Sequence, residues 1–189
     1  MEIRRPPAIR RTNNVSAVSK SVAENSPPTR TDEFAPKRIL VPTDFSQSAD
    51  RALNYAVSIA RLYKAEILVL HVFQLQEYLG LLSQKAQIDE RTADEVLKIA
   101  KTQAVDSLEE TVRRHADAEV AMNPDLVIGV PFEEIVEYAA QREVDLIVMP
   151  THGRTGLTHF FLGSTTERVI ERAACPVLAV KETHQTSVS

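Results

Sequence analysis

The chain has 189 residues, a formal net charge of −4 and a single cysteine. This length suits one domain with appendages, and the acidic balance argues against a nucleic-acid partner, because binding a phosphate backbone requires a basic surface. Cys175 alone excludes an internal disulfide and a cysteine-based zinc cluster, which suits a reducing compartment. No apolar run is long enough for a transmembrane helix or a signal-peptide core, so we expect a soluble cytoplasmic protein with no membrane contact.

Residues 1–36 differ in composition from the rest of the chain. They hold five of the ten prolines, many Ser, Asn, Thr and Arg residues, and few large apolar groups. Such a segment cannot bury enough surface to offset its ordering entropy, so we predict a disordered N-terminal extension. Its start is basic, which would suit an arm that touches a membrane or a nucleic acid, but we favour a solvated tail.

From residue 37 onward, short apolar runs recur without polar alternation, which is typical of strands buried on both faces of a parallel sheet. Pro42 ends the first of these runs. The predicted strands are 39–41, 67–73, 126–128, 145–149 and 177–180.

Helical spacing of apolar residues separates these strands. It appears in residues 49–60, 93–112 and 135–139, and Pro131 is placed to be the first residue of its helix. The order predicts a single α/β domain over 37–181, a doubly wound open parallel sheet with helices on both faces, followed by a polar tail at 182–189.

The loop after the fourth strand combines glycines, hydroxyls and Arg154, and it ends at Gly163-Ser164. Ser164 and Glu167 have the spacing of a capping box, which predicts a helix that starts at this point. A glycine before a helix N-terminus lets a ligand approach free N–H groups that favour anions, so we interpret the loop as a phosphate site. The alternative is a tight turn and a helix cap with no ligand.

Position in the sheet supports the ligand interpretation. In open sheets of this class, ligands lie beyond the carboxyl ends of strands where the strand order reverses. The loop after the first strand holds Asp44, and it would flank the same crevice as the loop from Pro150 to Gly163 if the two strands are neighbours. Neither a P-loop motif nor G-x-G-x-x-G occurs, so any nucleotide must bind by another arrangement.

Taken together, these stretches resemble the universal stress protein family over about residues 37–181. Residues 39–46 match its opening strand and loop, and residues 70–72 match the end of its second strand. Gly153, nine residues and then Gly163-Ser164 match the second half of its nucleotide signature, G-x2-G-x9-G-[ST]. Residues 175–177 match its closing strand.

The resemblance implies strand order 3-2-1-4-5, a homodimer through Val177 to Val180, and binding of ATP or AMP, in some members with Mg²⁺ or Mn²⁺ at the phosphates. It places Asp44 near the ribose, the Val72 backbone at the adenine and Met149 near the sugar. The implied nucleotide-binding residues are Pro42, Thr43, Asp44, Val72, Met149, Pro150, Gly153, Arg154, Gly163, Ser164, Thr165 and Thr166.

One position departs from the signature, because the first glycine is Pro150 here. Proline has no N–H and a fixed φ, so any ligand contact that needs either is lost, while the phosphate half of the signature is intact.

Three functions stay open on the sequence. The first is a nucleotide-binding module in stress response or signalling, with an unidentified protein partner. The second is a slow ATPase, although no base is visibly aligned on a water molecule. The third is a dimeric interaction protein of the same fold that binds no nucleotide.

Overall fold

The computed structural model describes residues 34–76, 80, 90–152 and 162–181. The chain divides into two units, Met1–Phe34 and Ala35–Ser189, and every helix and strand below belongs to the second. The predictions for residues 1–33, for the polar tail at 182–189 and for the signature loop at 153–161 lie outside the described residues.

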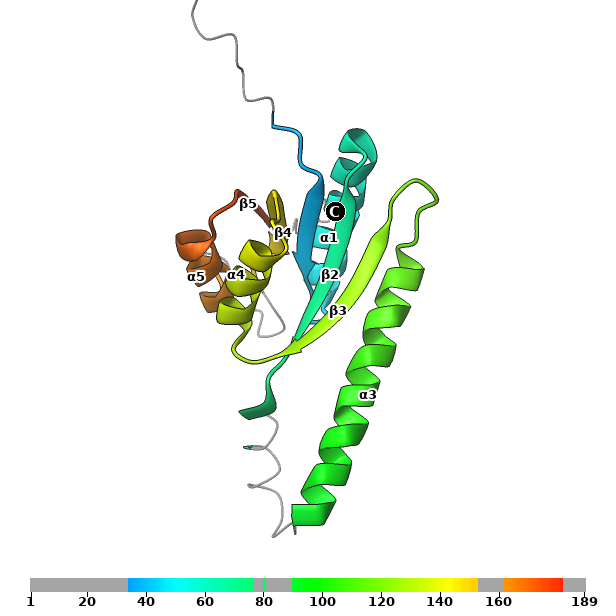
Figure 1. The fold of residues 1–189 in the computed structure, drawn as a ribbon, viewed down its shortest axis with the longest axis vertical. Helices are drawn as coiled ribbons and strands as arrows, with labels where there is room; N and C mark the ends of the chain where they lie inside the picture. Colours follow the sequence, from blue (N-terminus) through cyan, green and yellow to red (C-terminus); the bar gives the residue numbers. More distant parts are fainter. Residues whose placement is uncertain (1–33, 77–79, 81–89, 153–161, 182–189) are drawn as a thin grey trace, which may run out of the picture. The chain divides into compact units, whose positions relative to one another are not determined.

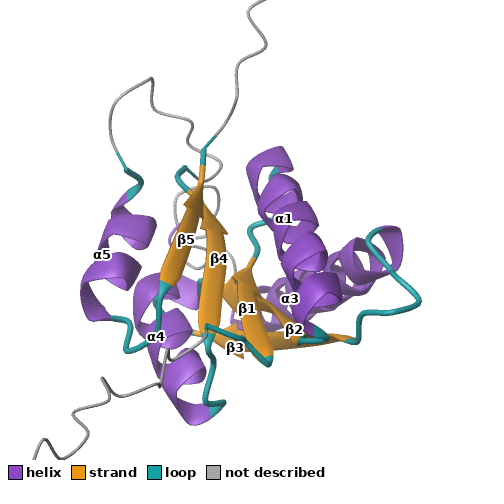
Figure 2. Cartoon of the chain, turned by 90° about the horizontal axis from the view of Figure 1, so that it is seen from above, coloured by secondary structure: helices purple, strands orange, loops and turns teal. Residues whose placement is uncertain are grey.

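Five parallel strands form one sheet in the order β3-β2-β1-β4-β5, which confirms the predicted fold class (Figures 1 and 2). The strands are β1 (Arg38–Pro42), β2 (Glu66–Phe73), β3 (Met122–Ile128), β4 (Leu146–Pro150) and β5 (Val177–Val180). The described helices are α1 (Gln47–Tyr63), α3 (Glu90–Arg114), α4 (Pro131–Gln141) and α5 (Ser164–Arg172).

Two apolar layers hold the sheet, because successive side chains of a strand point to opposite faces. In β1, Ile39 and Val41 pack with α1 and the end of α3, whereas Leu40 packs with α4 and α5. Figure 2 shows these two helix pairs on opposite faces of the sheet. The buried stretches of the central strands are therefore almost wholly apolar, which is the pattern that the sequence analysis interprets as a doubly covered parallel sheet.

The helices begin and end where local chemistry allows. Ser46 caps α1 by accepting a hydrogen bond from the Ala49 N–H at 3.2 Å, and Lys64 ends the helix in the left-handed conformation. Pro131 is at the start of α4, as the sequence predicts. None of the helices in the described part of the chain is long and apolar enough to cross a membrane.

Strand β3 is longer than predicted, and the sequence places its start too late. It begins at Met122 rather than Leu126 and contains Pro124. Because β3 is an edge strand, only alternate N–H groups face β2, and Gly129 N donates to Phe73 O at 3.2 Å. Counting back by twos from Gly129 leaves Pro124 on the open side, where a missing N–H costs no ladder hydrogen bond.

Candidate functional site

Strands β1 and β4 are neighbours, and they diverge at their carboxyl ends. Only Ile39↔Leu146 and Leu40↔Ile147 pair between them, whereas β1 and β2 stay paired to the end of β1. On either side of this point the strand order runs in opposite directions, which is where open α/β sheets bind ligands. A cavity of about 580 Å³ opens there.

Two prolines explain why the ladder stops. Thr43 N donates to Leu70 O of β2 at 2.8 Å, and Thr151 N donates to Val180 O of β5 at 3.0 Å. Since successive N–H groups of a strand point to opposite neighbours, Pro42 and Pro150 hold the positions that face the gap between β1 and β4. Neither has an N–H to donate. The gap therefore stays open, and both prolines line the cavity.

The loop after β1 is shaped by its own side chains. Thr43 Oγ1 accepts from Phe45 N at 3.1 Å, and Asp44 Oδ1 accepts from Ser46 N at 3.0 Å. Phe45 has a φ of 65°, in the left-handed region. These turns place Thr43 and Asp44 in the wall of the cavity, directly before the cap of α1.

The end of β2 forms the next part of the wall. His71 Nδ1 lies 2.8 Å from Thr43 O, and its ring centroid is 4.3 Å from that of Phe45. Since a carbonyl oxygen only accepts, Nδ1 carries the proton in this contact. His71 is thus a hydrogen-bonded residue at the edge of the core, and it lines the cavity together with Val72 and Gln74.

Two hydrogen bonds connect the N-terminus of α5 to the end of β4. Gly163 N donates to Thr151 O at 2.8 Å, and the buried Thr166 hydroxyl donates to Pro150 O at 2.9 Å. The capping box predicts Ser164 as the N-cap, but in the structure the N-cap lies one residue earlier. Gly163 is the N-cap, without a side-chain cap bond, and Ser164 is the first helical residue. The predicted capping box is therefore wrong.

The start of α5 offers hydrogen-bond donors to a ligand in the cavity. The first N–H groups of a helix have no intrahelical partner, and they carry the positive end of its dipole. In α5 these groups belong to Ser164, Thr165 and Thr166, and all three residues line the cavity. This end of the cavity can therefore bind an anion.

Another part of the cavity wall is apolar, and α4 supplies some of it. Val130 precedes the helix without a side-chain cap bond, and Phe132 and Ile135 point into the same space. Leu70 and Met149 complete the apolar surface from the sheet side. One cavity thus combines an anion-binding helix N-terminus with an apolar wall.

The structure brings together ten of the twelve residues that the resemblance implies at the nucleotide, and all ten line this cavity: Pro42, Thr43, Asp44, Val72, Met149, Pro150, Gly163, Ser164, Thr165 and Thr166. The other two, Gly153 and Arg154, lie outside the described residues. The sequence analysis did not predict the other eight lining residues, namely Leu70, His71, Gln74, Val130, Pro131, Phe132, Ile135 and Arg168. Helical spacing predicts packing for Ile135, and no local motif marks the others as residues of a binding site.

Charge in the cavity is sparse. Asp44 is the one carboxylate, and Arg168 the one arginine, among the described residues that line it. Within the ranges that the structure describes, no three His, Cys, Asp or Glu side chains gather in a way that could hold a metal ion.

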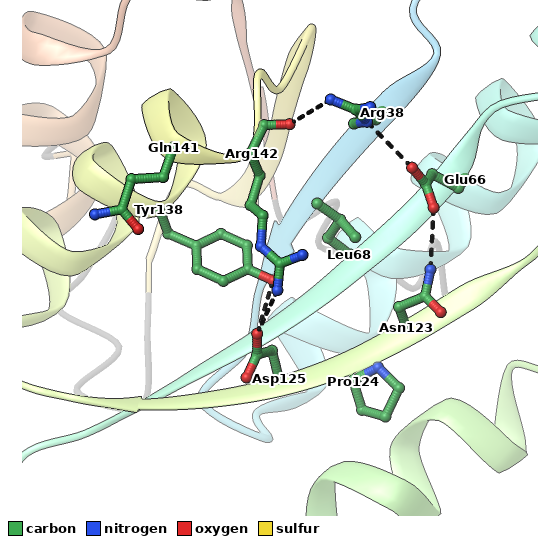
Figure 3. A pocket seen from close by; sticks show the side chains of 9 residues that line it. All are labelled: Arg38, Glu66, Leu68, Asn123, Pro124, Asp125, Tyr138, Gln141 and Arg142. Atoms are coloured by element: carbon green, nitrogen blue, oxygen red, sulfur yellow. Dashed lines mark hydrogen bonds and ion pairs between the residues drawn. The ribbon is translucent and has the colours of Figure 1, made fainter.

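A second cavity, of about 500 Å³, lies at the amino ends of β1, β2 and β3 beside the end of α4 (Figure 3). Its charged groups are paired with one another. Arg38 contacts Glu66 at 3.2 Å, while Asp125 accepts from the Tyr138 hydroxyl at 3.0 Å and from Arg142 at 3.1 Å. This network joins three strands and α4, so we assign it a structural role.

Tyr138 makes this role measurable. Burial, and then its hydrogen bond to Asp125, raise the pKa of Tyr138 from 10.0 to about 12. Between these two values the folded state keeps a proton that the unfolded state releases, so stability is unaffected below pH 10 and falls as the pH rises to 12. We expect a loss on the order of 2 kcal/mol. Thermal melts across this pH range measure it, and Tyr138→Phe should lack that part of the loss. An equal decline in both proteins would contradict the assignment.

Comparison with known proteins gives one consistent result. The model of the universal stress protein family matches residues 36–181. Universal stress protein MJ0531 of Methanocaldococcus jannaschii is 35% identical over 153 residues, which is 81% of this chain and 86% of that protein. The solved structure of MJ0577 from the same organism has a TM-score of 0.67 and 34% identity, covering 79% of this chain and 98% of that one.

A third match is more distant. The structure of the universal stress protein from Archaeoglobus fulgidus in complex with dAMP has a TM-score of 0.50 and 24% identity. It covers 76% of this chain and 97% of that one. At this identity the match shows a shared fold.

Proposed function

Because the chain belongs to the universal stress protein family, and because its cleft joins an anion-binding helix end to an apolar wall, we propose that it is an adenine-nucleotide-binding module of stress response or signalling. The cleft between β1 and β4 is the observation that carries this proposal. Its volume of about 580 Å³ falls in the range of small-molecule sites, roughly 300–1,000 Å³. We assign the module to the cytoplasm.

Each part of a nucleotide has a matching part of the cleft. The phosphates lie at the free N–H groups of Ser164, Thr165 and Thr166, where a helix end favours anions. The ribose lies near Asp44, whose carboxylate can accept hydrogen bonds from sugar hydroxyls. The base lies on the apolar surface, which includes Val72.

The fold relative from Archaeoglobus fulgidus, which is in complex with dAMP, supports an adenine nucleotide as the class of ligand. The low identity transfers no individual contact, so the residue assignments rest on the cleft of this chain. Mg²⁺ or Mn²⁺ would enter the cleft bound to the phosphates of the ligand, since Asp44 is the one carboxylate among its described lining residues.

Two measurements test the proposal. Nucleotide released from the purified, denatured protein is identified by chromatography, and ATP and AMP are titrated calorimetrically with and without magnesium. We expect binding in both measurements. No binding at millimolar nucleotide would contradict the proposal and favour the interaction protein without a ligand, whereas steady ATP turnover would favour the slow ATPase.

We also propose that the chain forms a homodimer through β5. This strand is a sheet edge, and an exposed edge invites pairing with another strand. Leu178 is 38% exposed although it is a large aliphatic residue, while Val180 is buried. Two copies related by a two-fold axis would pair their β5 edges antiparallel and cover Leu178.

Replacing Leu178 with Lys should therefore give monomers in light scattering at micromolar concentration, because a charge would be buried in the pairing edge. Ile99→Lys on α3, at a site that is 56% exposed, is the matched control and should leave the dimer intact. A wild-type protein that is monomeric at this concentration would refute the dimer.

A further inference from the structure

Arg168 and Arg172 lie one helical turn apart on α5 and contact the same aromatic ring. The Arg168 guanidinium carbon is 4.7 Å from the centroid of Phe132, and that of Arg172 is 4.9 Å from it. Phe132 is in the first turn of α4, so these contacts join the two helices that cover this face of the sheet (Figure 1). The two arginines have nearly equal roles in the packing of α4 against α5.

Only one of the two arginines lines the cleft. Arg168 and Phe132 are in its wall, and Arg172 is not. Side chains of a helix lean toward its N-terminus, so Arg168 covers the turn before its own Cα, which contains Ser164. Ser164 and Arg168 are four residues apart and thus share one face of α5. The guanidinium therefore lies in the wall of the cleft on the same face of α5 as Ser164.

The charge of Arg168 is not neutralised by a described neighbour. Over residues 34–76, 90–152 and 162–181, the ion pairs of the structure involve other arginines, such as Arg38, Arg114 and Arg142. The ring of Phe132 restrains the guanidinium, and no described residue accepts a hydrogen bond from its N–H groups. A restrained cation with free donors at the wall of an anion site can bind a phosphate oxygen.

We propose that Arg168 binds a second phosphate group of the ligand, so that the cleft prefers nucleoside di- and triphosphates to monophosphates. This inference rests on the proposed nucleotide function. The first phosphate occupies the N–H groups at the start of α5, and Arg168 begins one helical turn, about 5.4 Å, further along the helix. A single phosphate held by the N–H groups stays at the first turn, whereas a linked second phosphate extends along the helix face to the guanidinium.

The experiment compares AMP, ADP and ATP by calorimetric titration against wild-type protein, Arg168→Ala and Arg172→Ala. Arg172→Ala is the matched control, because it removes an equivalent contact with Phe132 outside the cleft. We expect Arg168→Ala to weaken ADP and ATP about tenfold, the scale of one charge-assisted hydrogen bond at an exposed site, and to change AMP less than about twofold. Arg172→Ala should leave all three affinities within about twofold of the wild type. Thermal melts should shift equally in both variants.

A lysine variant and a salt titration test the role of the Arg168 charge further. Arg168→Lys should recover part of the ADP and ATP affinity, and added salt should reduce the difference between wild type and Arg168→Ala. Equal losses for AMP and ATP in Arg168→Ala, or equal losses in the two alanine variants, would overturn the second-phosphate assignment while the nucleotide function stands. Absence of all nucleotide binding by the wild type would instead refute the function, and this inference with it.

Discussion

Gly163→Val should lower the melting temperature by several degrees and weaken nucleotide binding at least tenfold. The backbone of Gly163, with φ −62° and ψ 143°, is open to any residue, so the reason for glycine is space. A Cβ at this position would lie 3.2 Å from Thr151 O and 3.7 Å from His152 Cα. Thr151 O also accepts the Gly163 N–H, so valine must push the start of α5 away from β4.

The expected size follows from the cost of overpacking. Extra methyl groups against a fixed backbone cost roughly 1–3 kcal/mol, and about 2–4 °C of melting temperature is lost per kcal/mol in a protein of this length. Binding weakens as well, because the displaced helix start carries the N–H groups that face the cleft. Thermal melts and calorimetric titration measure the two effects separately.

Gly129 offers a matched control, since it also precedes the start of a helix. A Cβ at Gly129 would meet the Glu134 side chain, which can move aside, whereas at Gly163 it meets backbone. Gly129→Ala should therefore cost little, and Gly163→Ala should lower the melting temperature more. Equal effects of the two alanine variants would show that the contact with Thr151 is not the reason for glycine at position 163.

The strands that the sequence predicts well are those whose burial is uniform. Apart from His71 and Asp145, residues 39–41, 67–73 and 145–149 are all apolar, because helices cover both faces of the central sheet. Strand β3 is predicted only in part. As an edge strand it is half exposed and tolerates Pro124, so neither its polarity nor its proline resembles the pattern of a central strand.

The cleft is predictable to the extent that it follows from topology and from motifs. The resemblance places its residues on the loops after β1 and β4, and the parallel sheet brings those loops together. Phe132 and Arg168 could not be identified in this way, because they meet only through the packing of α4 on α5. The start of α5 depends on the contact between Gly163 and Thr151, which no local spacing reveals.

Pro150 is the position at which the chain departs from the family signature. The structure shows where an N–H group at this position would point. Thr151 N donates to β5, so the N–H of a different residue at position 150 would point between β1 and β4 into the cleft. The Pro150 carbonyl already accepts the Thr166 hydroxyl at 2.9 Å. Proline therefore leaves this part of the cleft wall without a backbone N–H donor.

Pro150→Ala and Pro150→Gly should both increase nucleotide affinity, by about threefold to tenfold, which corresponds to one added neutral hydrogen bond. Both variants restore the N–H, but only glycine also removes the Cβ. Equal gains would assign the effect to the N–H, and a gain in glycine alone would assign it to space beside the ligand. Both should lower the melting temperature slightly, because proline restricts the unfolded chain. Calorimetric titration with ATP measures the affinity, and if neither variant binds more tightly than the wild type, the bound nucleotide does not contact this position.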